Sequence, residues 1–188
     1  MIHRHDNDRW KAAQGDRRAF SALMAATSSD LYRFIRRYVG DAHEAHDLLQ
    51  ETYASAWLAI RRYDPQRPFE IWLRSIAVNK CRDWGRKRTV RRIVRRIVRG
   101  VMGLDAPEAL AVGEDTAGAE DRLDDRRRLI ELDRALADLP ATLKEPLLLA
   151  AIEGRSHAEI AGILGVTTKA VETRIARARH KLSLALNV

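Results

Sequence analysis

The last helix that the sequence predicts carries hydroxyl and basic side chains at spacings that suit contact with duplex DNA. Val171 and Ile175 recur at helical spacing within residues 168–186, so one face of this helix is expected to pack inward. The other positions hold short hydroxyls, bases and one acid, namely Thr168, Lys169, Glu172, Thr173, Arg174 and Arg177. Such groups contact phosphates and base edges in the major groove. A solvated helix of an ordinary bundle is the alternative interpretation.

A second set of candidate side chains lies on a helix predicted to start at about Phe69. Five of its residues share one stripe: Trp72, Ile76, Asn79, Asp83 and Arg86. This stripe leads into a basic run, with nine Lys or Arg and one acid between residues 82 and 99. A ring that stacks on a base, an amide that reads its edge and cations that follow the backbone favour single-stranded nucleic acid. Burial of Trp72 in the core is the commoner alternative for a helical tryptophan.

A third candidate surface is acidic and lies on a helix predicted from Asp41 to about Ile60. Its outward side would hold Asp47, Gln50, Glu51, Ala54 and Leu58, opposite a core side of Ala45, Leu49, Thr52, Ala56 and Ile60. A leucine among acids on an outer face indicates a protein-binding surface. An ordinary charged surface with one exposed leucine explains the pattern equally well.

Start and stop residues place these surfaces on separate helices. A helix from Asp16 to Tyr38 would end at Gly40, and Asp41 with Glu44 resembles a capping box for the next one. The prolines within residues 63–68 predict a loop before the Phe69 helix.

The C-terminal stretch has the pattern of a helix-turn-helix. A helix over residues 129–139 would end at Pro140, and a leucine-rich stretch would end at Gly154. Ser156 and Glu159 predict a capping box, Gly165 a turn, and Thr167 or Thr168 the start of the last helix.

Composition predicts an all-α fold and argues against several other classes. The 188 residues contain 10 Gly and 5 Pro, with 34 Lys+Arg against 26 Asp+Glu and a net charge of +8. The few glycines and prolines disfavour a turn-rich β-sandwich, and Cys81 alone cannot form an internal disulfide. No apolar run is long enough to span a bilayer, and the first residues have no apolar signal segment, so we expect no membrane insertion and a cytoplasmic protein.

Enzymatic and metal-binding motifs are not found. His43 and His46 have the wrong spacing for a zinc-protease motif, and Cys81 is expected to be a small core residue. The sequence has no phosphate-binding glycine loop, nucleophile elbow or triad. We therefore expect no catalytic residue, no metal and no cofactor.

An acidic segment divides the chain. Residues 105–125 hold eight acids and one base, with Pro107, Gly113 and Gly118 and no aromatic residue. This composition predicts a flexible linker over 98–126, between one helical domain over 1–97 and another over 127–188.

The two domains together resemble the extracytoplasmic-function (ECF) sigma factors of bacterial RNA polymerase. Residues 45–57 (AHDLLQETYASAW) resemble region 2.2 of that family, and residues 69–84 (FEIWLRSIAVNKCRDW) resemble regions 2.3 and 2.4. Leu139-Pro140 and residues 156–181 resemble region 4. Two departures are His46, where the family often has an acid, and Lys169, where a small residue is common.

The resemblance implies a promoter-specificity subunit with no catalytic activity of its own. Its docking face for the RNA polymerase core would be Asp47, Gln50, Glu51 and Leu58. The single-stranded −10 element would be bound by Arg67, Trp72, Asn79, Asp83 and Arg86. The duplex −35 element would be bound by Thr168, Lys169, Glu172, Thr173, Arg174 and Arg177. An anti-sigma factor is the further partner that the family implies.

Two other functional classes stay open at this point. A stand-alone helix-turn-helix regulator would use the same last helix on duplex DNA, but the N-terminal block shows no ligand-pocket signature and no heptad seam. A small enzyme or RNA-binding protein would use the arginine run, but no catalytic constellation accompanies it.

Overall fold

Helices make up all of the regular structure that the computed structural model describes, which covers residues 4–102 and 120–186. Side chains are described within residues 7–91 and 129–186. The elements in chain order are α1 (Arg4–Ala13), α2 (Arg17–Val39), α3 (Ala42–Ala59), the 3-10 turn η1 (Ile60–Arg62), α4 (Phe69–Met102), α5 (Glu120–Asp138), α6 (Ala141–Glu153), α7 (His157–Leu164) and α8 (Thr168–Leu186). The predicted all-α fold is confirmed.

The ends of α2 show how local chemistry sets the helix boundaries. Asp16 precedes the helix, and its carboxylate accepts hydrogen bonds from the backbone N–H groups of Arg18 and Ala19 at 2.8 and 3.1 Å. These bonds satisfy donors that have no partner within the first turn. At the other end Gly40 adopts a left-handed φ of 80°, which a glycine enters without steric cost. The predicted boundaries of this helix are therefore confirmed.

Helix α1 is the element that the sequence did not predict. Its sequence is mostly polar, and Ala12 is its one fully buried apolar residue within the described side chains. A helix that buries so little shows no apolar stripe, which is the main signal for a helix in a sequence. The helix packs against α2 and lies beside η1 and the loop after it, where Arg9 donates a hydrogen bond to the carbonyl oxygen of Arg67 at 3.5 Å.

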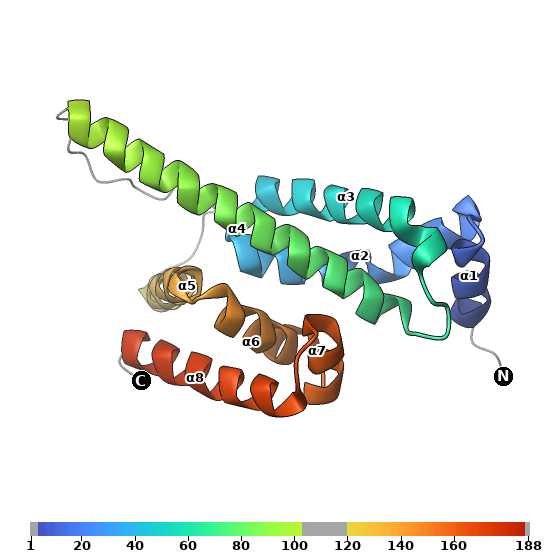
Figure 1. Cartoon of the computed structure of the whole chain (residues 1–188). Helices are drawn as coiled ribbons and strands as arrows, with labels where there is room; N and C mark the ends of the chain where they lie inside the picture. The colour runs from blue at the N-terminus through green and yellow to red at the C-terminus, as the bar shows by residue number, and fades with distance from the viewer. Residues whose placement is uncertain (1–3, 103–119, 187–188) are drawn as a thin grey trace.

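Helices α1 to α4 form the N-terminal domain, with α2 in contact with each of the other three (Figure 1). The large side chains at its centre are fully buried and include three aromatic or branched residues of α2, Leu31, Phe34 and Ile35. Phe69 and Leu73 at the start of α4 close this core. Beyond the core α4 projects past the other helices as a free-standing segment.

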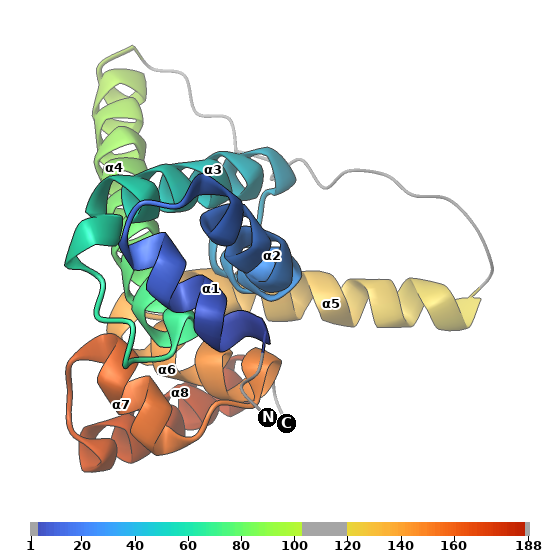
Figure 2. The same ribbon diagram turned by 90° about the vertical axis from the view of Figure 1, so that its right-hand side faces the viewer.

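Helices α5 to α8 form the C-terminal domain, in which α8 packs against the other three. Its buried residues are aliphatic and include Leu149, Ile160, Val171 and Ile175. The two domains contact each other directly, because α6 packs on α2 and α7 packs on α4 (Figures 1 and 2).

The predicted linker overlaps helices at both of its ends. Helix α4 continues to Met102 and α5 begins at Glu120, whereas the prediction placed a flexible segment over 98–126. Arginine is a good helix former, and Val90, Ile93, Val94, Ile97 and Val98 recur at helical spacing among the arginines, so the basic run can extend the helix. The middle of the predicted linker, residues 103–119, lies outside the described residues.

Candidate functional site

The outward side of α3 presents the acidic surface that the sequence predicted. Asp47, Gln50 and Glu51 are exposed, and Leu58 is 86% exposed, which is unusual for a leucine. We call these four residues the acidic α3 face. The opposite side of the helix is buried through Ala45, Leu48, Thr52 and Ala56, whereas Leu49, which was expected on the core side, is half-buried. Lys80 of α4 approaches one residue of this face, with its Nζ 3.7 Å from a carboxylate oxygen of Glu51.

A hydrogen bond between α3 and α4 fixes this surface. Asp41 caps α3 by accepting a hydrogen bond from the backbone N–H of Glu44 at 2.9 Å. The reciprocal bond of a full capping box is not made, because the Glu44 carboxylate accepts a hydrogen bond from Trp84 Nε1 at 2.9 Å. The predicted capping box is therefore half formed, and its second acid joins α3 to α4 instead.

Trp72 lies at the start of α4, between the core and solvent. Its half-buried ring packs against Tyr63 and Phe69, with centroids 4.9 and 5.6 Å apart. Tyr63 donates its hydroxyl hydrogen to the carbonyl oxygen of Arg67 at 2.5 Å, and burial raises the pKa of Tyr63 to about 12. The ring therefore belongs to an aromatic cluster that also supports the loop between η1 and α4. This half-buried position is compatible with both predictions for Trp72, contact with a base and packing in the core.

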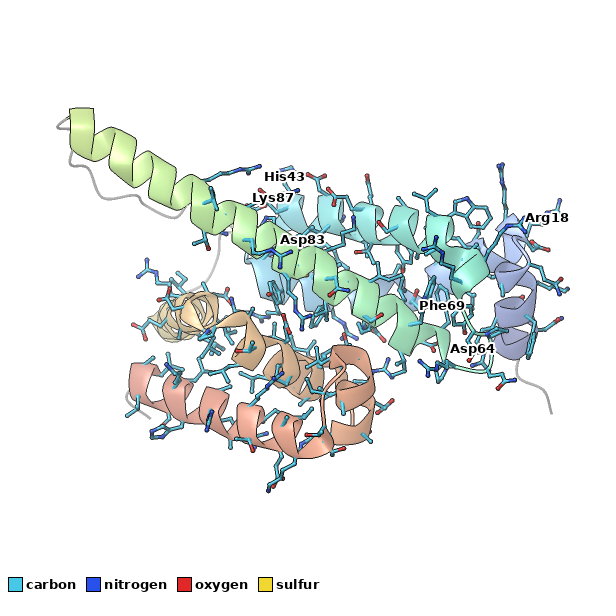
Figure 3. The ribbon with its side chains drawn as sticks, viewed as in Figure 1. Arg18, His43, Asp64, Phe69, Asp83 and Lys87 are labelled. Atoms are coloured by element: carbon cyan, nitrogen blue, oxygen red, sulfur yellow. The ribbon has the colours of Figure 1, made fainter. Side chains whose placement is uncertain are left out.

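Of the other residues of the predicted stripe on α4, Ile76 is half-buried against the core, and the polar ones are exposed. Asn79, Asp83 and Arg86 lie on the outer side of the helix, where Asp83 and Arg86 form an ion pair. Figure 3 shows Asp83 and Lys87 along this helix. Arg67, from the preceding loop, is exposed and lies 4.0 Å from a carboxylate oxygen of Asp64. The exposed side of α4 thus combines an amide, an acid and bases beside an aromatic cluster.

The helix-turn-helix forms as predicted from α7, a turn and α8. The Ser156 side chain accepts from the backbone N–H of Glu159, and the Glu159 carboxylate accepts from the backbone N–H of Ser156 at 2.9 Å. The hydrogen bonds that the carboxylate accepts from the backbone N–H and the hydroxyl of Ser156, and from Arg155, hold the pKa of Glu159 below its usual value. Gly165 makes the turn with a left-handed φ of 66°. Thr167 caps α8 by accepting a hydrogen bond from the backbone N–H of Ala170 at 3.2 Å.

The start of α8 presents a polar surface to solvent. Val171, Ile175 and Ala178 are buried, whereas Thr168, Lys169, Glu172, Thr173 and Arg177 are exposed and Arg174 is half-buried. Lys169 forms an ion pair with Glu172 at 2.9 Å, which lowers the pKa of the glutamate. Thr173 donates its hydroxyl hydrogen to the backbone oxygen of Lys169 at 2.9 Å. Within the described residues Arg174 and Arg177 have no ion-pair partner, so their guanidinium groups are available for phosphates or bases.

Four charged residues at the contact between the domains were missed in the sequence. Arg74 and Arg82 of α4 pair with Glu153 and Glu145 of α6. The one local signal is the position of Glu145, which only Pro146 separates from the run Leu147 to Leu149. A charge within an apolar stretch predicts a buried partner, but nothing local identifies that partner.

The histidines and the cysteine give no metal site in the described part of the chain. No group of three or more His, Cys, Asp or Glu side chains gathers there to hold a metal ion. His43 is exposed, and His46 lies with its ring centroid 4.6 Å from that of Tyr32. Cys81 is fully buried, and burial raises the pKa of its thiol well above the ordinary value. None of the helices over residues 4–102 and 120–186 combines the length and apolarity that crossing a membrane requires.

Comparison with known proteins shows the family. The chain matches Sigma-70 region 2 over residues 23–91 and Sigma-70, region 4 over residues 129–182. The RNA polymerase sigma factor CnrH of Cupriavidus metallidurans is 38% identical over 178 residues, which cover 94% of this chain and 91% of CnrH. The ECF sigma factor SigC of Mycobacterium tuberculosis is 36% identical over 172 residues, covering 91% and 85% of the two chains.

Two solved structures match nearly the whole chain. CnrH in complex with the cytosolic domain of CnrY has a TM-score of 0.68 and 30% identity, covering 97% of this chain and 96% of CnrH. The sigma factor RpoE in complex with the anti-sigma factor NepR from Bartonella quintana has a TM-score of 0.65 and 25% identity, covering 90% and 97%. The two matched regions contain the acidic α3 face, the α4 stripe and the helix-turn-helix. The chain belongs to the extracytoplasmic-function family of RNA polymerase sigma factors.

Proposed function

We propose that this sigma factor binds the RNA polymerase core through the acidic α3 face and directs it to promoters through two separate DNA-binding surfaces. The observation that carries the proposal is that each domain exposes a different set of side chains. The exposed side of α4 places an amide and bases next to an aromatic cluster, whereas the start of α8 exposes hydroxyls, bases and one acid without an aromatic ring. One promoter protein can thus contact separated strands and intact duplex at the same time.

The α4 surface suits DNA whose strands have separated. Taking a base out of the stack costs a few kcal/mol, and stacking and edge hydrogen bonds offset this cost. Trp72 supplies the ring, Asn79 the amide, and Arg67 and Arg86 the cations that follow the backbone. Asp83 pairs with Arg86 and holds its guanidinium on the exposed side of the helix.

The α8 surface suits duplex DNA. Arg174 and Arg177 carry guanidinium groups that bind phosphates or guanine edges, and Thr168 lies at the first turn, where recognition helices contact the groove. In the free protein the Lys169 side chain bonds to Glu172, and the Thr173 hydroxyl donates to the backbone oxygen of Lys169. Contact with DNA would therefore require Lys169 and Glu172 to exchange partners.

The chemistry of transcription would come from the polymerase core, with this chain acting in the cytoplasm as a subunit without catalytic residues. The relatives CnrH and RpoE are bound by CnrY and by the anti-sigma factor NepR in their solved complexes. We extend this to the present chain and propose an anti-sigma partner that keeps it from the polymerase.

Run-off transcription with purified core polymerase tests the proposal. We expect transcripts from genomic promoter fragments that depend on this protein and start at defined positions. Tight binding to promoter duplex without polymerase, and no transcript with it, would instead indicate a stand-alone helix-turn-helix regulator.

The docking face has its own test by charge reversal. Changing Asp47 and Glu51 to Lys should weaken binding to core polymerase at least about tenfold, because reversing charges at an interface creates repulsion. Stability should change by no more than about 0.5 kcal/mol, since both residues are exposed. The matched control reverses two other exposed acids, Asp30 and Glu131, and should leave core binding unchanged. Normal core binding by the Asp47/Glu51 variant would show that the docking face lies elsewhere.

A further inference from the structure

At the contact between the two domains, a buried carboxylate of the C-terminal domain forms its ion pair with an arginine of the N-terminal domain. Glu145 of α6 is 0% exposed, and within the described residues its one ion-pair partner is Arg82 of α4. Arg82 binds it with two parallel hydrogen bonds, Nε to Oε1 at 2.8 Å and Nη2 to Oε2 at 2.6 Å. A guanidinium binds a phosphate group with the same two-pronged geometry. The carboxylate of Glu145 therefore occupies Arg82 in the way that a DNA phosphate would.

Arg82 lies at the edge of the proposed −10 surface. Its third nitrogen, Nη1, donates a hydrogen bond to the side-chain oxygen of Asn79 at 3.3 Å, and Asp83 is its neighbour in sequence. Arg82 is 34% exposed although its partner is fully buried, so the guanidinium bridges the domain contact and the exposed side of α4.

A second ion pair holds the domains together without reaching the DNA-facing side. Arg74 binds Glu153 at 2.8 and 2.6 Å, and both side chains are almost completely buried. Burial raises the pKa of Glu153 and lowers that of Arg74. The Arg74 guanidinium lies over the ring of Phe34, 5.7 Å from its centroid, on the inner side of α4. Both arginines therefore link the two domains through ion pairs, but only Arg82 also borders the proposed DNA surface.

Buried ion pairs of this kind suit a contact that opens. The attraction between the charges is largely cancelled by the cost of removing them from water, so such pairs add little net stability. When the domains separate, water solvates both carboxylates, and Arg82 remains on α4 next to Asn79.

Resting on the proposed function, we propose that Arg82 is a further DNA-contacting residue, bound to a backbone phosphate beside Asn79, and that Glu145 masks it in the closed arrangement. The C-terminal domain thereby lowers the affinity of the N-terminal domain for single-stranded DNA until the domains part. Opening and phosphate binding are then coupled, because Arg82 cannot bind both anions at once.

The test uses the full chain and a labelled 20-nucleotide single strand of mixed sequence as the probe. Binding is measured by fluorescence anisotropy over a series of salt concentrations, and domain opening by the radius of gyration in X-ray scattering. Glu145→Gln should increase the radius and tighten binding at least about fivefold, the lower end of ordinary coupling between sites. The slope of log K against log salt should steepen by roughly 0.7, the value for one phosphate on a single strand.

Two further variants separate opening from phosphate contact. Arg82→Gln with Glu145→Gln should be as open as Glu145→Gln but lose the gain in affinity and in salt slope. Glu153→Gln should open the domains through the other pair and show the same gain, since Arg82 is retained. Glu131→Gln, a matched change at an exposed acid of α5, should alter neither radius nor binding.

Each outcome decides the proposal. A compact Glu145→Gln variant with unchanged binding would overturn it, and so would an open double variant that binds as tightly as Glu145→Gln. If circular dichroism shows that Glu145→Gln does not fold, Glu153→Gln compared with Glu153→Gln/Arg82→Gln gives the same decision. If these binding tests fail while transcription in the run-off assay still depends on this protein, only the present inference is rejected. If the variants gain DNA binding but the run-off assay gives no transcript, the proposed function is rejected.

Discussion

The two domains differ most in their aromatic residues. Every Phe, Tyr and Trp of the sequence lies at or before Trp84, and none occurs in the hundred or so residues that follow. The N-terminal core is built around Phe34 and Phe69, whereas Leu149 and Ile160 fill the centre of the C-terminal domain. Both domains are helical, so the contrast does not come from secondary structure.

The difference follows the kind of DNA that each domain would bind. A base taken out of the duplex offers a flat face, which an aromatic ring covers well. The edges of paired bases in the major groove offer hydrogen-bonding groups, which hydroxyls and guanidinium groups match. An aliphatic core is sufficient to hold a recognition helix, while a domain that captures bases uses rings both in its core and at its surface.

The largest expected effects are losses of stability when a buried side chain is removed from the core of either domain. Phe34→Ala should lower the free energy of unfolding by about 3–5 kcal/mol, and Ile160→Ala by about 2–5 kcal/mol. All four tryptophans lie in the N-terminal domain, so tryptophan fluorescence in a urea titration reports that domain, while far-ultraviolet circular dichroism reports both. We expect Phe34→Ala to shift the fluorescence transition more than Ile160→Ala does. Equal shifts in both signals for both variants would mean that the domains unfold as one unit.

The next effect distinguishes the steps at which the two DNA surfaces act. Arg174→Ala should cost about 1–3 kcal/mol in formation of the closed promoter complex, because it removes a contact to duplex. Asn79→Ala should leave that complex nearly intact and reduce strand opening, since its target is hidden in paired DNA. Gel-shift titration with core polymerase measures the first step, and permanganate reactivity of unpaired thymines measures the second.

A promoter with a pre-melted bubble sharpens this comparison. It should partly rescue Trp72→Ala, because the cost of opening has already been met, and it should not restore −35 binding to Arg174→Ala. Equal failure of both variants at the closed step, without rescue by the bubble, would assign Trp72 to the core alone.

The smallest expected effects concern Glu159 and Glu44, each of which lies three residues after the N-cap residue of its helix. Glu159 completes a capping box, so Ser156→Ala should lower stability by about 1 kcal/mol without changing tryptophan fluorescence. Glu44 bonds to Trp84 instead, so Glu44→Ala should change the emission of that tryptophan. Thermal unfolding and emission spectra measure the two outcomes. An unchanged spectrum for Glu44→Ala would contradict the contact between α3 and α4.

Local signals explain which parts of the structure could be predicted. The helix-turn-helix was predicted in full because Ser156, Glu159 and Gly165 encode its caps and turn within ten residues. Helix α1 was missed because it buries almost no apolar surface. The pairing of Arg82 with Glu145 joins positions 63 residues apart, and a single sequence contains no signal for such a contact.

The loop between η1 and α4 is held by its own hydrogen bonds. Tyr63 closes it onto Arg67, and Asp64 accepts from the backbone N–H groups of Gln66, through its side chain, and Arg67, through its carbonyl, both at 3.0 Å. A segment already ordered before it meets its ligand loses little conformational entropy on binding. If the loop binds an unpaired base as we propose, little of the affinity gained from each contact would be spent on ordering the loop.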